Sequence, residues 1–333
     1  MRGKIKSVIK MKIAILGTGA YGLALATVFH DNNCSIHMWS KFQEEIKDLS
    51  SKRKSKILNF KIPEDIMFTN NMGECVKDAN VIVIAVPAQF VDNVSEELKK
   101  YFKPNQHICI ASKGIENDTC LFVSDVLKKH IKTKNVAVIS GPSFAVDIVN
   151  KVPIGLSLGT KNKETESLLK KCLANKYLKL RTTDDIIGVE ICGSIKNVIA
   201  IAAGMLDGMR LPESTQAMFI TESLHDIKEL IKILGGNKNT ILAFAGFGDL
   251  LLTCTSTKSR NFTFGNLIGQ NKPQKEIDDY ISHTTIEGLY TLKSIYKLLN
   301  NKKAHIPIID LIYDIIFGKI SPESLKSFLI TKD

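Results

Sequence analysis

Hydrophobic residues follow two different patterns along this chain of 333 residues. In the first half, short unbroken apolar runs alternate with segments of helical periodicity. Such runs are typical of strands that are buried on both faces of a parallel sheet. Because helical segments separate them, residues 11–184 are predicted to form a Rossmann-like, doubly wound α/β domain. The expected strands cover residues 12–16, 34–39, 81–86, 107–111, 135–140, 154–158 and 177–181.

The pattern changes near residue 184, where long helical periodicities begin and clear strands end. Asp184 or Asp185 is a suitable N-cap for the first of these helices. We therefore predict an all-α C-terminal domain over residues 185–333. Its expected helices cover residues 185–205, 214–234, 285–299 and 308–317.

Two polar segments fall outside these elements. Residues 50–56 are Lys-rich and are predicted to form a loop. Residues 1–10 are basic but lack a long apolar stretch and a small-residue cleavage site, so they are a poor signal peptide. We interpret them as an extended leader, and translation from Met1 or from Met11 both remain open.

Composition narrows the range of partners. The formal net charge of +11 comes mostly from scattered lysines without interleaved aromatic residues. This favours a solvated surface over a nucleic-acid face, although an anionic small ligand also fits. No uninterrupted apolar run reaches the roughly 18 residues that a membrane span needs, so no integral membrane segment is expected. The seven cysteines are widely spread, which indicates reduced thiols in a cytoplasmic protein. The histidines lack metal-ligand spacing, so no metal is expected.

A glycine-rich turn follows the first predicted strand and opens a helix. Gly17, Gly19 and Gly22 match the pattern G-x-G-x-x-G. In this pattern the first glycine makes the tight turn, the second lets the backbone approach a pyrophosphate, and the third lets helix and strand pack closely. The context predicts a dinucleotide site, whereas a turn that serves packing alone is the simpler alternative.

The end of the second predicted strand bears on the choice of dinucleotide. NAD-preferring sites normally place Asp or Glu there, to bind the ribose 2′-hydroxyl. This chain has Ser40 and Lys41, and its first carboxylate is Glu44. A hydroxyl and an ammonium suit a 2′-phosphate better, so NADPH is the preferred cofactor and NADH stays possible. Alternatively, Lys41 is only a solvated residue at the start of a helix.

Candidate chemistry gathers where ligands bind in such sheets, beyond the carboxyl ends of the strands. Lys113 and Ser143 follow two of the predicted strands. Lys196 lies in the apolar middle of a helix, which is unfavourable unless the amine is paired or functional. Snorkelling at the rim of the helix is the alternative. Asp249, in a Gly-rich apolar stretch, is a natural partner for Lys196, and Arg260 suits forked phosphate contacts.

These residues belong to blocks that, taken together, resemble the bacterial-type NAD(P)-dependent glycerol-3-phosphate dehydrogenases. The resemblance runs from Met11 to about Gly318. Its order and number of blocks are far more specific than the glycine-rich turn alone. The blocks are residues 17–22, 112–114, 139–145, 187–190, 196–205, 245–250, 252–255, 259–261 and 286–288.

The resemblance implies hydride transfer between sn-glycerol 3-phosphate and dihydroxyacetone phosphate, supply of glycerol 3-phosphate for phospholipid synthesis, and a homodimer. It makes Lys196 the proton acceptor, with Lys113 and Asp249 beside it. It places the substrate at Lys113, Gly141, Ser143, Lys196, Asp249, Ser259, Arg260 and Asn261. It places the cofactor at Gly17, Gly19, Ala20, Tyr21, Gly22, Lys41, Lys113, Ala145, Arg260, Thr285 and Glu287.

The implied mechanism requires that Lys196 have a lowered pKa. A free lysine with a pKa near about 10.4 is a poor base at neutral pH, so burial or a nearby cation must lower its pKa. Lys113 could supply that cation. Asp249 acts in the opposite direction and is expected to orient the amine.

The chain departs from the family in a few places. Gln216 and the run Thr221–Ser223, which includes Glu222, replace a basic residue and Thr-Arg-Gly. This puts in doubt phosphate capture or subunit packing. Ala20 replaces a common serine, which removes one possible hydroxyl contact to the pyrophosphate. Two other functions stay open, a related β-hydroxyacid or sugar-phosphate dehydrogenase and a catalytically idle NADPH-binding sensor.

Overall fold

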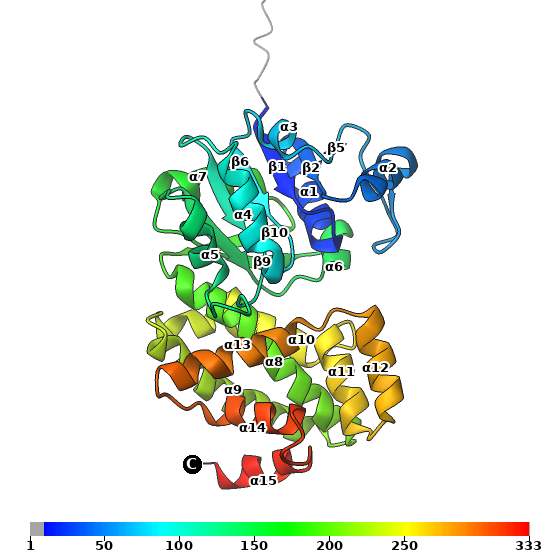
Figure 1. Ribbon diagram of the computed structural model, residues 1–333, viewed down its shortest axis with the longest axis vertical. Coiled ribbons are helices and arrows are strands. Elements are labelled where there is room, and N and C mark those ends of the chain that lie inside the picture. The colour runs from blue at the N-terminus through cyan, green and yellow to red at the C-terminus, as the bar shows by residue number, and fades with distance from the viewer. Residues whose placement is uncertain (1–9, 333) are drawn as a thin grey trace, which may run out of the picture.

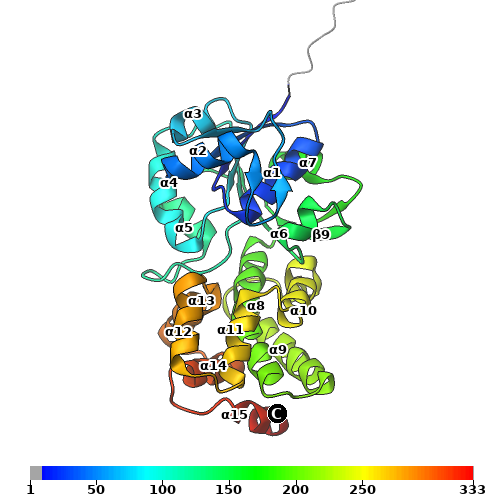
Figure 2. The ribbon, with the colours of Figure 1, turned by 90° about the vertical axis from the view of Figure 1, so that its right-hand side faces the viewer.

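The computed structural model describes residues 10–332, so all but the last residue of the predicted leader lies outside the described residues. The chain forms two stacked parts (Figure 1). The sheet and its covering helices make up one part, and the other part is helical throughout the described residues. The view turned by 90° shows the same separation, with α8 running from the junction into the helical part (Figure 2).

The sheet has eight strands in the order β10-β9-β8-β7-β6-β1-β2-β5. All neighbouring pairs are parallel except β8 with β9. From β5 to β8 the order is that of a dinucleotide-binding fold, and the strand order reverses at β1, where such folds bind their ligands. The strands are β1 (Lys12–Leu16), β2 (Ser35–Trp39), β5 (Met67–Thr69), β6 (Val81–Ile84), β7 (His107–Ile110), β8 (Val136–Ser140), β9 (Ile154–Gly159) and β10 (Leu178–Thr183).

Each central strand contributes to two hydrophobic cores, one on each face of the sheet. In β1, Ile13 and Ile15 pack into the core that contains α1, whereas Ala14 and Leu16 pack into the core that extends into the helical part. Both faces therefore demand apolar side chains, which explains the unbroken runs. The covering helices are α1 (Ala20–Asp31), α2 (Gln43–Lys52), α3 (Met72–Val76), α4 (Val91–Lys99), α5 (Val123–His130), α6 (Ala145–Val149) and α7 (Lys163–Leu173).

One feature of this domain was not predicted, and one expectation about it was wrong. Strand β9 runs antiparallel to β8, because an apolar run that is buried on both faces does not encode strand direction. Residues 50–56 do not form a simple loop. Helix α2 continues to Lys52, with Ile46 and Leu49 buried, and a short β3 (Lys54–Ser55) then pairs with β4 (Phe60–Lys61).

Helix α8 (Ile186–Gly208) is the axis of the helical part. Asp185 caps its N-terminus, because the side chain accepts a hydrogen bond from the backbone N–H of Gly188 at 3.0 Å. The sequence predicted α8, α9 (Glu213–Ile233), α13 (Glu287–Asn301) and α14 (Pro307–Ile316) but missed several shorter helices. Those are α10 (Asp249–Cys254), α11 (Arg260–Gly269), α12 (Gln274–His283) and α15 (Ser324–Thr331).

Helices α8 and α11 touch backbone to backbone. A Cβ atom built on Gly265 would lie 1.8 Å from the carbonyl oxygen of Ile201, and one on Gly204 would lie 2.0 Å from that of Phe262. Both distances are far below van der Waals contact. The absence of side chains at these glycines therefore sets how closely the two helices approach.

Helix α8, with 23 residues, is also long and apolar enough to span a membrane, and its most apolar stretch has a mean hydropathy of 1.7, although charged residues such as Glu190 and Lys196 interrupt it. Within the protein, however, 89% of its most apolar stretch is buried. Its apolar character is accounted for by its position at the centre of the helical part.

Candidate active site

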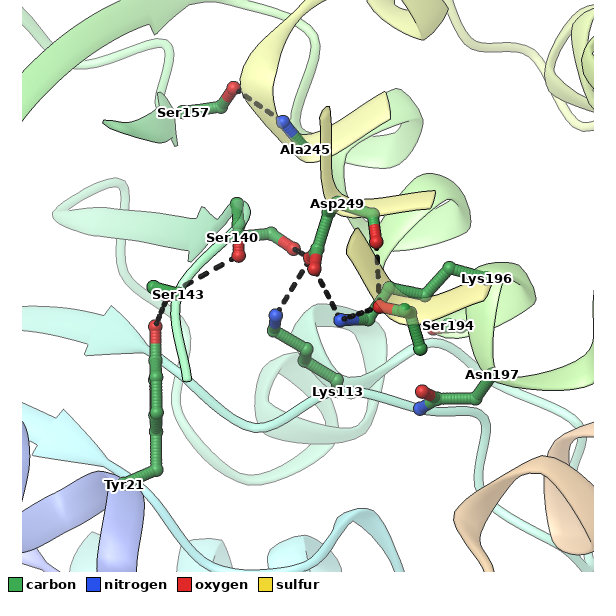
Figure 3. A network of polar contacts seen from close by, with 12 residues as sticks. Tyr21, Lys113, Ser140, Ser143, Ser157, Ser194, Lys196, Asn197, Ala245 and Asp249 are labelled. Atoms are coloured by element: carbon green, nitrogen blue, oxygen red, sulfur yellow. Dashed lines mark hydrogen bonds and ion pairs between the residues drawn. The ribbon is translucent and has the colours of Figure 1, made fainter. Parts of the chain in front are cut away.

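Two lysines and one aspartate meet where the sheet faces the helical part (Figure 3). Lys113 follows the carboxyl end of β7, Lys196 lies in the middle of α8, and Asp249 is the first residue of α10. The Lys113 Nζ lies 2.9 Å from Asp249 Oδ2, and the Lys196 Nζ donates a hydrogen bond to Asp249 Oδ1. The predicted pairing of Lys196 with Asp249 is therefore present. We call these three residues the Lys–Asp–Lys cluster.

Local structure holds Asp249 in place. The turn that precedes α10, Phe244–Gly248, is anchored to the sheet because the N–H of Ala245 donates to Ser157 Oγ on β9 at 3.0 Å. At the other side, the Thr253 hydroxyl donates to the backbone carbonyl of Asp249 at 2.6 Å and lies 3.1 Å from Lys196 Nζ. Thr253 was included in the block 252–255 but was not identified from the sequence as a partner of Lys196, although its place one helical turn after Asp249 was a usable signal.

The cluster shifts the pKa of each of its members. Burial disfavours the charged amine of Lys196, and together with the nearby charge of Lys113 it lowers the pKa of Lys196 from 10.5 to about 8. Burial also opposes the charge of Lys113, but the Asp249 carboxylate outweighs it and raises the pKa of Lys113. The pKa of Asp249 is lowered, since the two lysines overcome the effect of its burial. The three residues thus form a charged network with one amine that titrates near neutrality.

Tyr21 connects the glycine-rich turn to this cluster. Its hydroxyl lies 3.2 Å from Ser143 Oγ, and Ser143 in turn donates to the carbonyl of Gly141 at 3.2 Å. The Lys113 amine lies 5.7 Å from the centre of the Tyr21 ring, within reach of a cation–π interaction. Ser140, at the end of β8, donates to Asp249 Oδ2 at 3.3 Å. Residues from four separate elements therefore converge on one point.

The glycine-rich turn fits the phosphates of a dinucleotide. Gly17 has φ of +120°, and a Cβ there would lie 2.5 Å from the carbonyl oxygen of Ala85. A Cβ on Gly22 would lie 2.4 Å from the oxygen of Gly17, so this glycine lets α1 pack against the turn. Gly19 borders open space and starts α1 without a side-chain cap. Its neighbours Ala20 and Tyr21 begin the helix, whose N-terminal amides suit a phosphate.

The end of β2 holds a carboxylate that the sequence analysis overlooked. Ser40 is buried, and its hydroxyl donates to Glu45 Oε2 at 2.5 Å. Lys41 is exposed, and no ion pair involves it among the described residues. Glu45 lies in the first turn of α2, and its carboxylate reaches Ser40 at the end of β2. Its separation of five residues from Ser40 gave no indication of this contact in the sequence.

Thr285 and Glu287 lie beside the cluster. They line a cavity of about 330 Å³ together with Lys113 and Gly114. The carboxylate of Glu287 also accepts a hydrogen bond from the side-chain amide of Asn197 at 3.3 Å. These two predicted cofactor residues are therefore brought next to Lys113.

The block 259–261 lies at the start of α11. Ser259 caps the helix, since its hydroxyl accepts from the N–H of Phe262 at 3.2 Å, and Asn261 Oδ1 accepts from the N–H of Gly288 at 2.9 Å. Both side chains are thus already bonded to backbone. Arg260 is exposed and forms no ion pair with another described residue. Ala145, the first residue of α6, is partly buried.

The departures on α9 have structural partners within this chain. The carboxylate of Glu222 lies 3.2 Å from Lys332 Nζ, which also contacts Asp226 at 2.7 Å. Lys332 follows α15 and is only 8% exposed, so Glu222 serves to anchor the C-terminal helix. The amide of Gln216 donates to the carbonyl of Ala203 on α8 at 2.9 Å. Neither side chain contacts the Lys–Asp–Lys cluster.

No group of three or more His, Cys, Asp or Glu residues in residues 10–332 is arranged to hold a metal ion.

Comparison with known proteins shows which family has this sequence and fold. Residues 12–166 match the family description NAD-dependent glycerol-3-phosphate dehydrogenase N-terminus, and residues 185–327 match that of its C-terminus. A glycerol-3-phosphate dehydrogenase [NAD(P)+] of Fusobacterium nucleatum is 36% identical over 325 residues, covering 96% of this chain and 97% of the relative. The corresponding protein of Staphylococcus aureus is 33% identical over 329 residues, covering 97% and 98%.

Solved structures of the same family have the same fold as this chain. The glycerol-3-phosphate dehydrogenase of Coxiella burnetii superposes with a TM-score of 0.90 at 29% identity, covering 97% of this chain and 99% of the other. A D-mandelate dehydrogenase superposes with a TM-score of 0.62 at 14% identity, covering 95% and 100%, which shows a shared fold alone. On the fold, the two matched halves and the full-length relatives, this chain belongs to the NAD-dependent glycerol-3-phosphate dehydrogenase family.

Proposed function

We propose that this protein interconverts sn-glycerol 3-phosphate and dihydroxyacetone phosphate with a nicotinamide dinucleotide, and that Lys196 moves the proton of the 2-hydroxyl. One observation carries the assignment of Lys196. Its amine is buried, held by Asp249 and close to a second ammonium, and its pKa is lowered to about 8. A general base works best when its pKa lies near the working pH.

The residues divide the work as follows. A bound nicotinamide dinucleotide would supply the hydride chemistry at C2 of the substrate. The neutral amine of Lys196 takes the proton of the 2-hydroxyl, and during reduction its ammonium returns a proton to the forming alkoxide. Asp249 fixes the position of the amine, while the permanent charge of Lys113 lowers the pKa of Lys196 and stabilises negative charge on the substrate oxygen.

The substrate lies between the strand ends and α11 in this proposal. Gly141 and Ser143 border it on the side of the sheet, next to Lys113. On the side of the helical part, Arg260 supplies a forked positive group for the phosphate at the N-terminus of α11. Ser259 and Asn261 take part mainly by holding that N-terminus in place, since their side chains already bond backbone amides.

The cofactor extends from the glycine-rich turn to the cavity beside Lys113. Gly17, Gly19 and Gly22 shape the phosphate site, with Ala20 and Tyr21 at the helix start. Ala145, Thr285 and Glu287 border the nicotinamide half. We infer a preference for NADPH because Lys41 is exposed and available for a 2′-phosphate. The bond between Ser40 and Glu45 works against this preference, since the carboxylate repels that phosphate.

We also infer a cytoplasmic homodimer that supplies glycerol 3-phosphate for phospholipid synthesis. Large apolar side chains are exposed over α9, α10 and the segment between them, which supports a surface covered by a second copy. These residues are Met218, Leu242, Phe247 and Leu251. Light scattering on the purified protein measures the assembly directly, and a monomeric mass at micromolar concentration would contradict the dimer.

The test of the function compares initial rates with dihydroxyacetone phosphate and with unphosphorylated dihydroxyacetone, using NADPH or NADH. We expect rapid oxidation of the reduced nicotinamide with the phosphorylated substrate and faster turnover with NADPH. Rapid turnover with NADH preferred would keep the reaction and overturn the role of Lys41. Absence of turnover with either cofactor, despite tight binding of NADPH, would overturn the proposed function.

A further inference from the structure

A buried carboxylate outside the cluster has no role in the mechanism above. Glu190 lies on α8, nearly two helical turns before Lys196, and is 6% exposed. Its Oε1 accepts from the N–H of Ser124 at 2.8 Å, and its Oε2 accepts from the Ser124 hydroxyl at 2.6 Å. No lysine, arginine or histidine in residues 10–332 forms an ion pair with it. An acid buried without a counter-charge is unfavourable as an anion.

Glu190 separates two cavities of very different size. On one side is a rear cavity of about 820 Å³, which opens to solvent between α5 and the N-terminus of α8. On the other side is a small void of about 10 Å³, which is close to the room that one water molecule needs. Among the described residues that line either space, Glu190 is the one residue shared by both.

The small void touches the Lys–Asp–Lys cluster. Lys113 and Ser140 line it together with Glu190. The hydroxyl of Ser140 donates to Asp249 Oδ2 at 3.3 Å, and Asp249 Oδ1 accepts from Lys196. A single water molecule in the void would complete a continuous chain of polar groups from Lys196 to Glu190.

Hydrogen bonds to the backbone hold the two ends of this series of polar groups in place. The hydroxyl of Ser194 donates to the carbonyl of Glu190 at 2.7 Å and accepts from the N–H of Gly114 at 3.1 Å. The same hydroxyl thereby ties the turn of α8 that carries Glu190 to the loop that carries Lys113. The two ends of the polar chain are fixed relative to each other.

We propose that Glu190 is the proton-relay residue that connects the Lys–Asp–Lys cluster to solvent through the rear cavity. The inference rests on the proposed function, because it starts from a proton taken up by Lys196. Bound substrate and cofactor occupy the front of the site, so the rear route lets protons enter and leave while both are in place.

The proton balance is closed. During oxidation the 2-hydroxyl gives one proton to Lys196 while the hydride goes to the nicotinamide. Lys196 passes one proton to Asp249, which is ionised at rest and holds the proton only during the transfer. The Ser140 hydroxyl, having turned from Asp249 to the water, takes this proton on its oxygen as it releases its own proton to the water. The water passes one proton to Glu190, and Glu190 releases it to solvent in the rear cavity. During reduction every transfer runs in reverse, and each relay group returns to its starting state.

Charged residues line the two spaces that Glu190 borders, and two of them, Asp125 and Lys128, act on the pKa of Glu190 in opposite directions. Desolvation raises the pKa of Glu190 to about 7, while its bonds to Ser124 act in the opposite direction. A relay group needs such a pKa in order to bind and release a proton readily near neutrality. The charged residues that line the two spaces are Lys113, Asp125, Lys128, Lys134, Lys161, Asp184 and Asp185.

The deciding variant is Glu190→Gln, which keeps an oxygen for the N–H of Ser124 but cannot carry a proton. Asp184→Asn is the matched control, because Asp184 lines the rear cavity but not the small void. A single turnover with glycerol 3-phosphate and NADP⁺ is followed in weak buffer with a pH-indicator dye. In Glu190→Gln, hydride transfer in the first turnover is expected to persist while proton release slows by about tenfold or more. Asp184→Asn is expected to match the parent protein.

Two further results bear on the relay. Imidazole, a small proton carrier that fits the rear cavity, should restore proton release in Glu190→Gln. Infrared titration of the ligand-free protein should show one carboxylic-acid band that disappears near pH 7 and is missing in Glu190→Gln. Proton release at the parent rate in Glu190→Gln, or absence of that band, overturns the relay. Absence of any turnover in the parent protein overturns the proposed function instead, and the infrared titration still decides whether Glu190 exchanges a proton near neutrality.

Discussion

Two buried carboxylates, both close to α8, behave in opposite ways. Asp249 is 1% exposed and lies between two lysine amines, which lower its pKa despite its burial. Glu190 is 6% exposed and is held only by a hydroxyl and an amide, so burial raises its pKa to about 7. Burial alone therefore does not decide the charge of an acid in this protein. The neighbours decide it, because they keep Asp249 ionised between turnovers and leave Glu190 able to bind a proton near neutrality.

The largest expected effect comes from removing the amine that Asp249 holds. Lys196→Met should fold and bind NADPH but lose about a hundredfold or more in turnover, because a proton-transfer group typically contributes that much. Steady-state rates, circular dichroism and NADPH titration check the three statements. Turnover near that of the parent protein would contradict the assignment of Lys196.

The next effect comes from Asp249→Asn, which makes this carboxylate site neutral. Two buried ammonium groups then lose their counter-charge, and the free energy of unfolding should fall by about 3 kcal/mol or more. Turnover should fall as well, because the amine of Lys196 is no longer positioned. Urea unfolding measures the loss, and Lys163→Met, which breaks an exposed ion pair with Glu166, is the matched control. Equal stability of both variants would argue against a charged cluster.

The pH dependence of kcat/KM tests the Lys–Asp–Lys cluster without any substitution. The pKa of Lys196 is lowered to about 8, and its neutral form is the base. The kcat/KM for oxidation should therefore rise as the pH increases through about 8, and that for reduction should fall over the same range. Profiles that are flat between pH 6 and about 9 would rule out a lysine that titrates in the free enzyme.

The smallest expected effect is the contribution of Glu190 to the pH dependence of folding stability. Because the pKa of Glu190 is raised from 4.5 to about 7, the folded protein holds a proton that the unfolded chain has released between these values. Stability from this group is fully present below 4.5 and is lost as the pH rises to about 7. Glu190→Gln should remove this part of the decline. Thermal unfolding at several pH values measures it, and an unchanged slope would show that Glu190 is already ionised.

The strands and long helices were predictable because their patterns repeat over many residues. The run 12–16 and the periodicity of α8 each reflect a consistent demand for burial. Helices such as α12, which has no buried residue, leave no such pattern. The direction of β9 could not be predicted either, because an apolar run has the same pattern in a parallel and in an antiparallel strand.

Within the candidate site, Lys196 and Asp249 could be paired from the sequence because each was a charge in an apolar segment. The Ser40–Glu45 bond and the void beside Glu190 could not be foreseen. They depend on how a helix turn folds over a strand end and on how two domains meet, and these are features of tertiary packing. The acid of the block 187–190 was visible in the sequence, but that no described residue forms an ion pair with it was not.

The close crossing of α8 and α11 has a consequence for laboratory evolution of this enzyme. Alanine at Gly204 or Gly265 would wedge the helix that carries Lys196 away from its neighbour. A saturation library should therefore show almost no tolerated replacement at these positions, although both lie outside the polar cluster. Variants with new substrate preference are better sought at exposed Arg260, where side chains can be exchanged without displacing the scaffold.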